Sequence, residues 1–260
     1  MNMLKLLPLE LKRLLQSRFT WLVIALTAFS PVLGLILYKP ASATTMLSIY
    51  LANPAIAGGA AGGILFGVLT ICEWDRAVRH RVEVLMDAVV SPLSLALVRL
   101  SALILCALCA FALTLLAWLP ICKGLIGAVF DLSDYALAYL LFMGLALPLG
   151  ILAAAAAYQF CRRADLALLL FAAFAALSLT LWADNWQLCW LNPCVWALSD
   201  DFSNVRIFRS VGYMRLTWLL ALSGVWTLSW LCVRQYGKGL LGSLRQNIRR
   251  IYRPALVVIL

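Results

Sequence analysis

Charged residues are scarce in this chain. Asp, Glu, Lys and Arg make up only 12% of its 260 residues, whereas 65% are hydrophobic. A soluble domain of this length would need much more polar surface to cover a single core. The composition therefore indicates an integral membrane protein. A spanning helix takes about 20 apolar residues, so six of them would leave room for short loops and for no separate soluble domain.

Groups that could perform catalysis are also few. The single histidine, His80, lies in a polar segment between apolar runs, and the sequence contains neither HExxH nor GxSxG. The central parts of the predicted spans carry no Asp, Glu, Lys or Arg, which argues against an ion-coupled carrier and against a channel with a charged ring. We therefore expect no catalytic and no metal-binding residues.

A nucleotide-binding loop is missing as well. No GxxxxGK(S/T) occurs, and the nearest string, Gly237-Lys238-Gly239, lacks the required spacing. If the chain takes part in energised transport, ATP must be bound by a partner subunit. We expect no cofactor to bind directly to this chain.

Most of the eight cysteines lie inside apolar runs, where cysteine behaves as a small hydrophobe. Cys106 and Cys109 form a CxxC pattern, but the pattern lies within a predicted span and has no second pair. Cys189 and Cys194 fall in a predicted external loop. They could form a disulfide in an oxidising compartment or remain thiols.

The apolar runs predict an all-α membrane protein that forms one domain over residues 1–260. A short polar segment separates each run from the next. Glycine and proline near residue 148 predict a kink in the fourth run, and the largest external segment is expected at 184–214. The six predicted transmembrane helices cover about 19–38, 55–72, 93–121, 135–160, 164–183 and 215–233.

Residues 4–18 predict an amphipathic helix that lies in the plane of the membrane. Leucines recur there at helical spacing, and charged side chains occupy the other positions. The alternative is a plain cytosolic start to the first span. At the other end, residues 234–260 form a basic tail that closes on an apolar run after Pro254. That run could dock on the membrane surface or begin a seventh span.

The second predicted span is rich in glycine. Small residues four positions apart let another helix approach closely, so we expect this span to face the bundle or a subunit interface. A flexible helix without a special partner is the alternative. The helix-packing glycines are Gly58, Gly59, Gly62, Gly63 and Gly67.

The distribution of basic residues predicts the orientation of the chain in the membrane. Under the six-span assignment, 16 of the 21 Lys and Arg residues fall on the side of both termini, whereas the carboxylates divide almost evenly. Because cytoplasmic loops collect Lys and Arg, this distribution predicts that both ends are cytoplasmic. The formal net charge of +10 is therefore topology information, and we expect no nucleic-acid partner.

The polar segment 73–92 is predicted to form a cytoplasmic amphipathic helix. Apolar side chains from Trp74 to Val89 recur at helical spacing, and charges of both signs occupy the other face. Such a helix could grip the membrane bundle with one face and dock a soluble partner with the other. An ordinary interfacial loop helix has the same pattern.

The amino-acid sequence of this segment resembles the corresponding segment in the permease subunits of ABC-2 type transporters. Members of that family often carry an acidic residue at the end of span two, then a stretch like R-x-x-G-T-L-E-L-L-L-x-x-P-V-S-R, and then a Lys. The matching positions here are Glu73, Arg76, Glu83, Leu85, Met86, Ser91 and Arg99. The chain departs from the pattern at three positions, with His80 for Gly, Val89 for Pro and Pro92 for the basic residue.

The resemblance implies an architecture and a set of partners. It implies six spans, an in-plane helix before the first, and a cytoplasmic coupling helix between the second and third. That helix would dock a cytosolic ABC ATPase subunit, and a second permease subunit would complete a pathway for export across the cell inner or plasma membrane. The coupling residues would be Glu73, Arg76, Arg79, Glu83, Leu85, Met86 and Ser91.

Two other functions stay open from the residues alone. The chain could be a membrane scaffold or assembly factor that transports nothing. An intramembrane enzyme is the least favoured, because the catalytic groups are missing.

Overall fold

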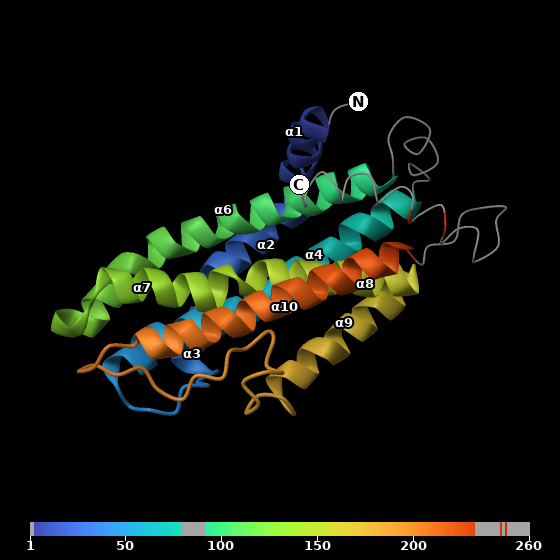
Figure 1. Ribbon diagram of the computed structural model, residues 1–260. Helices are drawn as coiled ribbons and strands as arrows, with labels where there is room; N and C mark the ends of the chain where they lie inside the picture. Colours follow the sequence, from blue (N-terminus) through green and yellow to red (C-terminus); the bar gives the residue numbers. More distant parts are fainter. Residues whose placement is uncertain (1–2, 80–91, 232–244, 246–247, 249–260) are drawn as a thin grey trace, which may run out of the picture.

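The computed structural model describes residues 3–79, 92–231, 245 and 248, and no β-strand occurs among them. The described chain is a bundle of long helices (Figure 1). In its centre α4 (Asn53–Arg79) packs against α8 (Ala146–Cys161). Around this pair lie α2 (Arg18–Phe29), α6 (Pro92–Ile126), α9 (Ala164–Leu179) and α10 (Val205–Leu231).

Four stretches of helix are long and apolar enough to cross a membrane. They are Arg18–Ile36, Ser48–Arg76, Ser94–Val129 and Leu132–Cys161. The chain is therefore a membrane-embedded helical protein, as its composition predicts. The 16 residues of α9 reach only about 24 Å, which is less than the hydrocarbon thickness of about 30 Å. Because α10 also falls outside the four stretches, the fifth and sixth spans stay predictions.

The four stretches divide into an inner and an outer pair. Of the most apolar window in each, 72% is buried in Ser48–Arg76 and 78% in Leu132–Cys161, but only 39% in each of the other two. The centre of the bundle is therefore made by the glycine-rich second stretch and the alanine-rich fourth, because small side chains allow the closest helix approach.

Three of the four stretches are interrupted helices. In the first, α2 ends before Ser30-Pro31 and a short α3 (Val32–Ile36) continues it. In the second, the π-helix η1 (Ser48–Ala52) precedes α4. In the fourth, α7 (Leu132–Ala138) passes into the π-helix η3 (Tyr139–Gly144) and then into α8. The third contains the 35 residues of α6 followed by the short 3-10 turn η2 (Gly127–Val129), and α6 continues through Pro120.

The turn between α8 and α9 is tight. The first helix ends at Cys161 and the next begins at Ala164. Arg162 adopts the left-handed conformation, with φ 53°, which terminates the helix in two residues.

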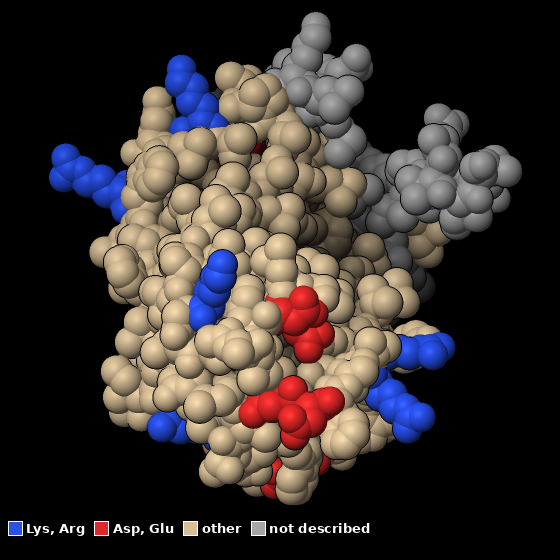
Figure 2. Space-filling view, turned by 90° about the vertical axis from the view of Figure 1, so that its left-hand side faces the viewer, with Lys and Arg blue, Asp and Glu red and all other residues tan. Residues whose placement is uncertain are grey.

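The bundle has two distinct ends. The end where α4, α8 and α10 finish and α6 and α9 begin is called here the cationic end (Figure 1). The opposite loop end gathers residues 37–47, 127–131 and 194–204. Figure 2 looks onto the loop end and shows a mostly uncharged surface with a group of carboxylates and scattered basic side chains.

Polar contacts tie the segments of the loop end together. The carboxylate of Asp200 accepts the amides of Met46 and Leu47 at 2.8 and 2.9 Å. The side chain of Asn204 donates to Asp134 at 3.0 Å. At the start of α7, Asp131 caps the helix, and the hydroxyl of Ser133 lowers the pKa of its carboxyl below the ordinary value.

The segment 184–214, predicted to be external, is partly helical and partly buried in the protein. The helix α10 begins at Val205, so Arg215 lies inside it rather than at its start. Cys189, Trp190 and Leu191 are fully buried, so the chain after α9 packs into the bundle. Irregular backbone is tolerated there because protein covers it.

Each of the five predicted packing glycines in α4 lies against another segment. A Cβ on Gly59 would overlap the carbonyl oxygen of Phe142, and one on Gly63 would lie 2.8 Å from Leu191. Added Cβ atoms on Gly58, Gly62 and Gly67 would meet Met143, Leu147 and Phe171, respectively. The contacts reach η3, α8, α9 and the buried loop, so the glycine positions pack against four other segments, whereas Ala61, Ile64, Leu65 and Val68 on another face are partly exposed.

Candidate functional site

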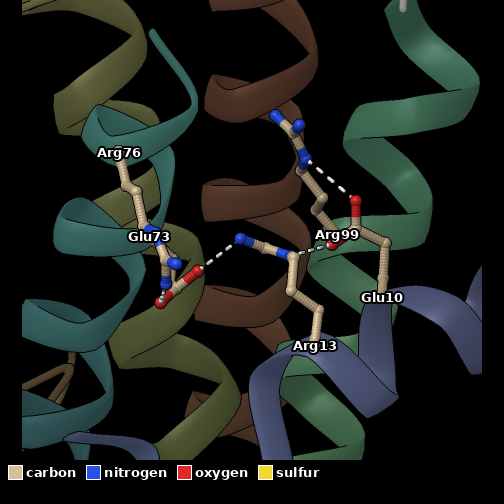
Figure 3. Close-up of polar contacts among 5 residues, drawn as sticks. All are labelled: Glu10, Arg13, Glu73, Arg76 and Arg99. Atoms are coloured by element: carbon tan, nitrogen blue, oxygen red, sulfur yellow. Dashed lines mark hydrogen bonds and ion pairs between the residues drawn. The ribbon is translucent and has the colours of Figure 1, made fainter. Parts of the chain in front are cut away.

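Five charged side chains from three helices form an ion cluster at the cationic end. Glu10 and Arg13 come from α1 (Met3–Leu15), Glu73 and Arg76 from the last turns of α4, and Arg99 from the start of α6 (Figure 3). We call this group the ion cluster. It joins elements that are far apart in the sequence.

Arg13 is the centre of the ion cluster. Its Nε donates to Oε2 of Glu10 at 2.7 Å, and its Nη1 lies 2.8 Å from Oε2 of Glu73. Two longer pairs complete the group: Nη1 of Arg76 is 3.7 Å from Glu73, and Nε of Arg99 is 3.5 Å from Glu10. A single guanidinium thus bridges α1 to α4, and a single carboxylate bridges α1 to α6.

The carboxylates of the ion cluster are buried, and part of its positive charge is exposed. The side chains of Glu10 and Glu73 are 9% and 6% exposed, whereas that of Arg76 is 53% exposed. Three guanidinium groups against two carboxylates leave one positive charge. Loss of one partner from a buried ion pair typically costs about 3–5 kcal/mol, because the other charge stays buried without compensation.

Local sequence explains how these side chains meet. Leu6, Glu10 and Leu14 are spaced four apart, so they share one face of α1, and all three are buried. That face packs on the first half of α6, with α1 lying crosswise to the bundle (Figure 1). The sequence pattern assigns Glu10 to the polar side of this helix, but the structure turns it inward.

The helix α4 extends past the predicted end of the second span at residue 72. It continues to Arg79, so Glu73 and Arg76 lie one turn apart on a regular helix. On the next face Tyr158 donates to Asp75 at 3.4 Å, and its ring meets that of Trp74 edge to face. The end of α4 is therefore fastened to α1 through the ion cluster and to α8 through this pair.

The ion cluster includes only part of the coupling set suggested by the resemblance. Glu73 and Arg76 are in it, and the backbone of Arg79 closes α4. Glu83, Leu85, Met86 and Ser91 lie outside the described residues. Sequence reasoning about the site missed Glu10 and Arg13, and it matched Arg99 to the family pattern without including it in the coupling set. The signal that could have identified Glu10 is its position midway between two leucines of one helical face.

A second polar centre lies inside the bundle at Arg215 of α10. This side chain is completely buried. Its guanidinium donates to backbone carbonyl oxygens only: Leu141 at 3.1 Å, Phe142 at 2.9 Å, Leu191 at 3.3 Å, and Trp190. Arg215, expected at the start of the sixth predicted span, therefore lies in the interior of the bundle.

The four carbonyl groups around Arg215 come from irregular backbone. Leu141 and Phe142 belong to the π-helix η3, and Trp190 and Leu191 belong to the buried loop. Irregular backbone leaves carbonyls without helical partners, and an unpaired carbonyl in a dry interior is costly. Arg215 supplies the missing donors and uses all its contacts on protein, so it does not face a pathway.

The buried loop is held by further specific contacts. The indole of Trp190 stacks on Phe174 with ring centroids 4.8 Å apart, and the amide of Leu191 donates to Ser178 at 3.0 Å. Cys189 and Cys194 are both free thiols in this structure. Their disulfide stays a prediction.

Among the described residues, no group of three or more His, Cys, Asp and Glu side chains could hold a metal ion. The ion cluster contains acids and bases that are paired with one another. What it can do is transmit displacement between α1, α4 and α6.

Comparison with known proteins assigns no family to the chain. No protein-family model matches the chain, and neither the curated proteins nor the solved structures contain a match.

Proposed function

We propose that this chain is the membrane-spanning permease subunit of an ABC-2 type transporter, and that a separate cytosolic ATPase subunit supplies the energy. The observation that carries the proposal is the ion cluster. It joins α1 to α4 and α6, the two helices on either side of residues 80–91. The sequence of that segment resembles the coupling helix of the family.

The ion cluster suits the transmission of force in this proposal. A push on residues 80–91 would act on the end of α4 and on the start of α6. Because Arg13 holds Glu10 and Glu73 together at 2.7 and 2.8 Å, sliding α4 away from α1 would break buried ion pairs. The three helices would therefore move as one unit.

The proposal also covers a second subunit, the position of α1 at the membrane and the substrate. A second permease subunit would enclose the pathway, and α1 would rest at the cytoplasmic face of the cell inner or plasma membrane. The largely uncharged bundle suits an amphiphilic substrate, which would be exported.

The direct test is affinity purification of the chain from native membranes. A nucleotide-binding protein should co-purify with the wild type. The charge reversal Arg79→Glu with Glu83→Arg should reduce that association while membrane insertion is unchanged. The matched control, Arg206→Glu with Asp201→Arg at the loop end, also conserves net charge and should keep the partner.

Two results would contradict the proposal. One is the absence of any ATPase from the wild-type complex, and the other is full retention of the ATPase by the Arg79 and Glu83 double variant. Vesicles that contain both chains test transport itself. An ATPase that co-purifies without ATP-dependent movement of any amphiphile would favour a membrane scaffold instead.

A further inference from the structure

The elbow between α1 and α2 exposes positive charge that no carboxylate of the described residues neutralises. We define the α1–α2 elbow as residues 12–22. Lys12 and Arg18 are exposed there, and neither forms an ion pair with a described residue. The single carboxylate between Met1 and Cys72 is Glu10, and it is turned inward to Arg13 and Arg99. The anion that balances this surface must come from outside the described chain.

An apolar strip begins directly after Arg18. Phe19, Leu22, Leu26 and Phe29 are 39%, 54%, 47% and 71% exposed. Their spacing of three and four places them on one face of α2, while Thr20, Val23, Ile24 and Thr27 are buried on the other. The strip runs from the elbow along the first candidate span.

Trp21 marks the boundary between the charged and the apolar parts. Its ring is 54% exposed, and its Nε1 donates across the elbow to the carbonyl oxygen of Leu15 at 2.7 Å. Tryptophan is enriched at the level of lipid headgroups because its ring is apolar and its N–H is polar. The headgroup level of the bilayer therefore falls at the elbow.

We propose that the α1–α2 elbow binds an anionic phospholipid, with the phosphodiester on Lys12 and Arg18 and the acyl chains along the strip from Phe19 to Phe29. Ammonium and guanidinium groups are the usual donors to a phosphate anion. A soluble phosphate would use only the two cations, whereas a phospholipid uses the cations and the strip together. The proposal does not depend on the proposed transport function.

Spin-labelled lipids in vesicles provide the test. The full chain is reconstituted in phosphatidylcholine, and its association with spin-labelled phosphatidylglycerol is compared with that of spin-labelled phosphatidylcholine. A cation near the membrane surface strengthens anionic-lipid binding about fivefold. We expect the wild type to prefer phosphatidylglycerol and the double variant Lys12→Gln with Arg18→Gln to lose the preference. The control Lys39→Gln with Lys123→Gln removes two cations elsewhere and should keep it.

The other outcomes are also decisive. Because both side chains are exposed, the variants should fold like the wild type, and Lys12→Arg with Arg18→Lys should retain the preference. A preference that survives Lys12→Gln with Arg18→Gln would overturn the proposal. If inorganic phosphate binds at Lys12 and Arg18 while the wild type shows no preference for phosphatidylglycerol, the elbow binds phosphate rather than a lipid, and the proposal is again overturned.

Discussion

Arg215 shows how one side chain can support two irregular segments of backbone. Its five N–H donors have a fixed planar geometry, and here they reach carbonyl oxygens from η3 and from the loop at 190–191. Lysine could not make these contacts, because its three donors radiate from a single nitrogen. The charge is tolerated inside the bundle because carbonyl dipoles surround it.

We predict that Arg215→Ala destabilises the protein strongly. It would leave four buried carbonyl oxygens without their donor, and each unsatisfied buried group costs about 1–3 kcal/mol. The expected loss is at least about 3 kcal/mol, measured by thermal unfolding in detergent. Arg209→Ala is the control, because Arg209 is exposed on the same helix and contacts only Tyr213. Equal melting temperatures for the two variants would show that Arg215 is not structural.

Arg13 performs the corresponding task at the cationic end. Its two short contacts join carboxylates that are buried on different helices. Arg76 is half exposed and 3.7 Å from Glu73, so water screens it and it contributes little. Within the ion cluster, the Arg13 contacts therefore hold α1 in place.

At the scale of elements, the contact of α4 with α8 and η3 decides the shape of the bundle. It is a contact of backbone on backbone: a Cβ on Gly59 would overlap the carbonyl oxygen of Phe142, and one on Gly150 would overlap that of Gly63. Backbone atoms cannot move aside as a flexible side chain can. The interhelical distance is therefore set by glycine, which explains why these two elements form the centre.

We predict that Gly59→Ala is destabilising even though alanine favours helices. Overpacking typically costs about 1–3 kcal/mol, which exceeds the gain of about 1 kcal/mol in helix propensity. Gly224→Ala in α10 is the matched control, since nothing lies within 4 Å of its added Cβ, and it should be neutral or stabilising. The measurement is thermal unfolding in detergent. A Gly59→Ala variant as stable as Gly224→Ala would mean that this helix face is open to lipid.

At the scale of the whole molecule, the two ends differ in composition. The cationic end carries the ion cluster, the exposed Arg162 and Arg163, and the elbow cations. The loop end carries Asp131, Asp134, Asp200 and Asp201 with fewer Lys and Arg. From the positive-inside rule we predict that the cationic end faces the cytoplasm.

Cysteine labelling tests this orientation. Single cysteines at Ser133 and at Arg163, placed in a chain whose native cysteines are replaced, are treated with a membrane-impermeant maleimide. We expect the cysteine at Ser133 to react in intact cells and the one at Arg163 to react only after permeabilisation. The reverse pattern would invert the topology and would place the ion cluster outside the cell.

Much of the first half of the fold could be predicted from the sequence. The glycine-rich second span and the uninterrupted third are long apolar runs, and such runs indicate helices in a membrane whatever their neighbours are. The turn at Arg162-Arg163 was also predictable, because two consecutive arginines between apolar runs mark a return to the interface. These features depend on local sequence alone.

Predictions from the sequence failed for side chains whose partners are distant in the chain. Arg215 looks like the polar start of a span, and Trp190 looks like an interfacial anchor, yet both are fully buried because each finds its partners on other segments. Glu10 is similar: its position on the polar side of an amphipathic helix gives no sign of Arg99.

The composition alone shows that this protein belongs in a lipid bilayer, because a chain with so few charged residues cannot cover a hydrophobic core in water. The sequence also determined that the chain is helical, since backbone groups in lipid must be satisfied within the segment. Only the tertiary structure decided which charges are buried. Burial of Arg215 and of the ion cluster is favourable only when donors and acceptors from three segments converge, and such convergence is a property of packing that no local pattern contains.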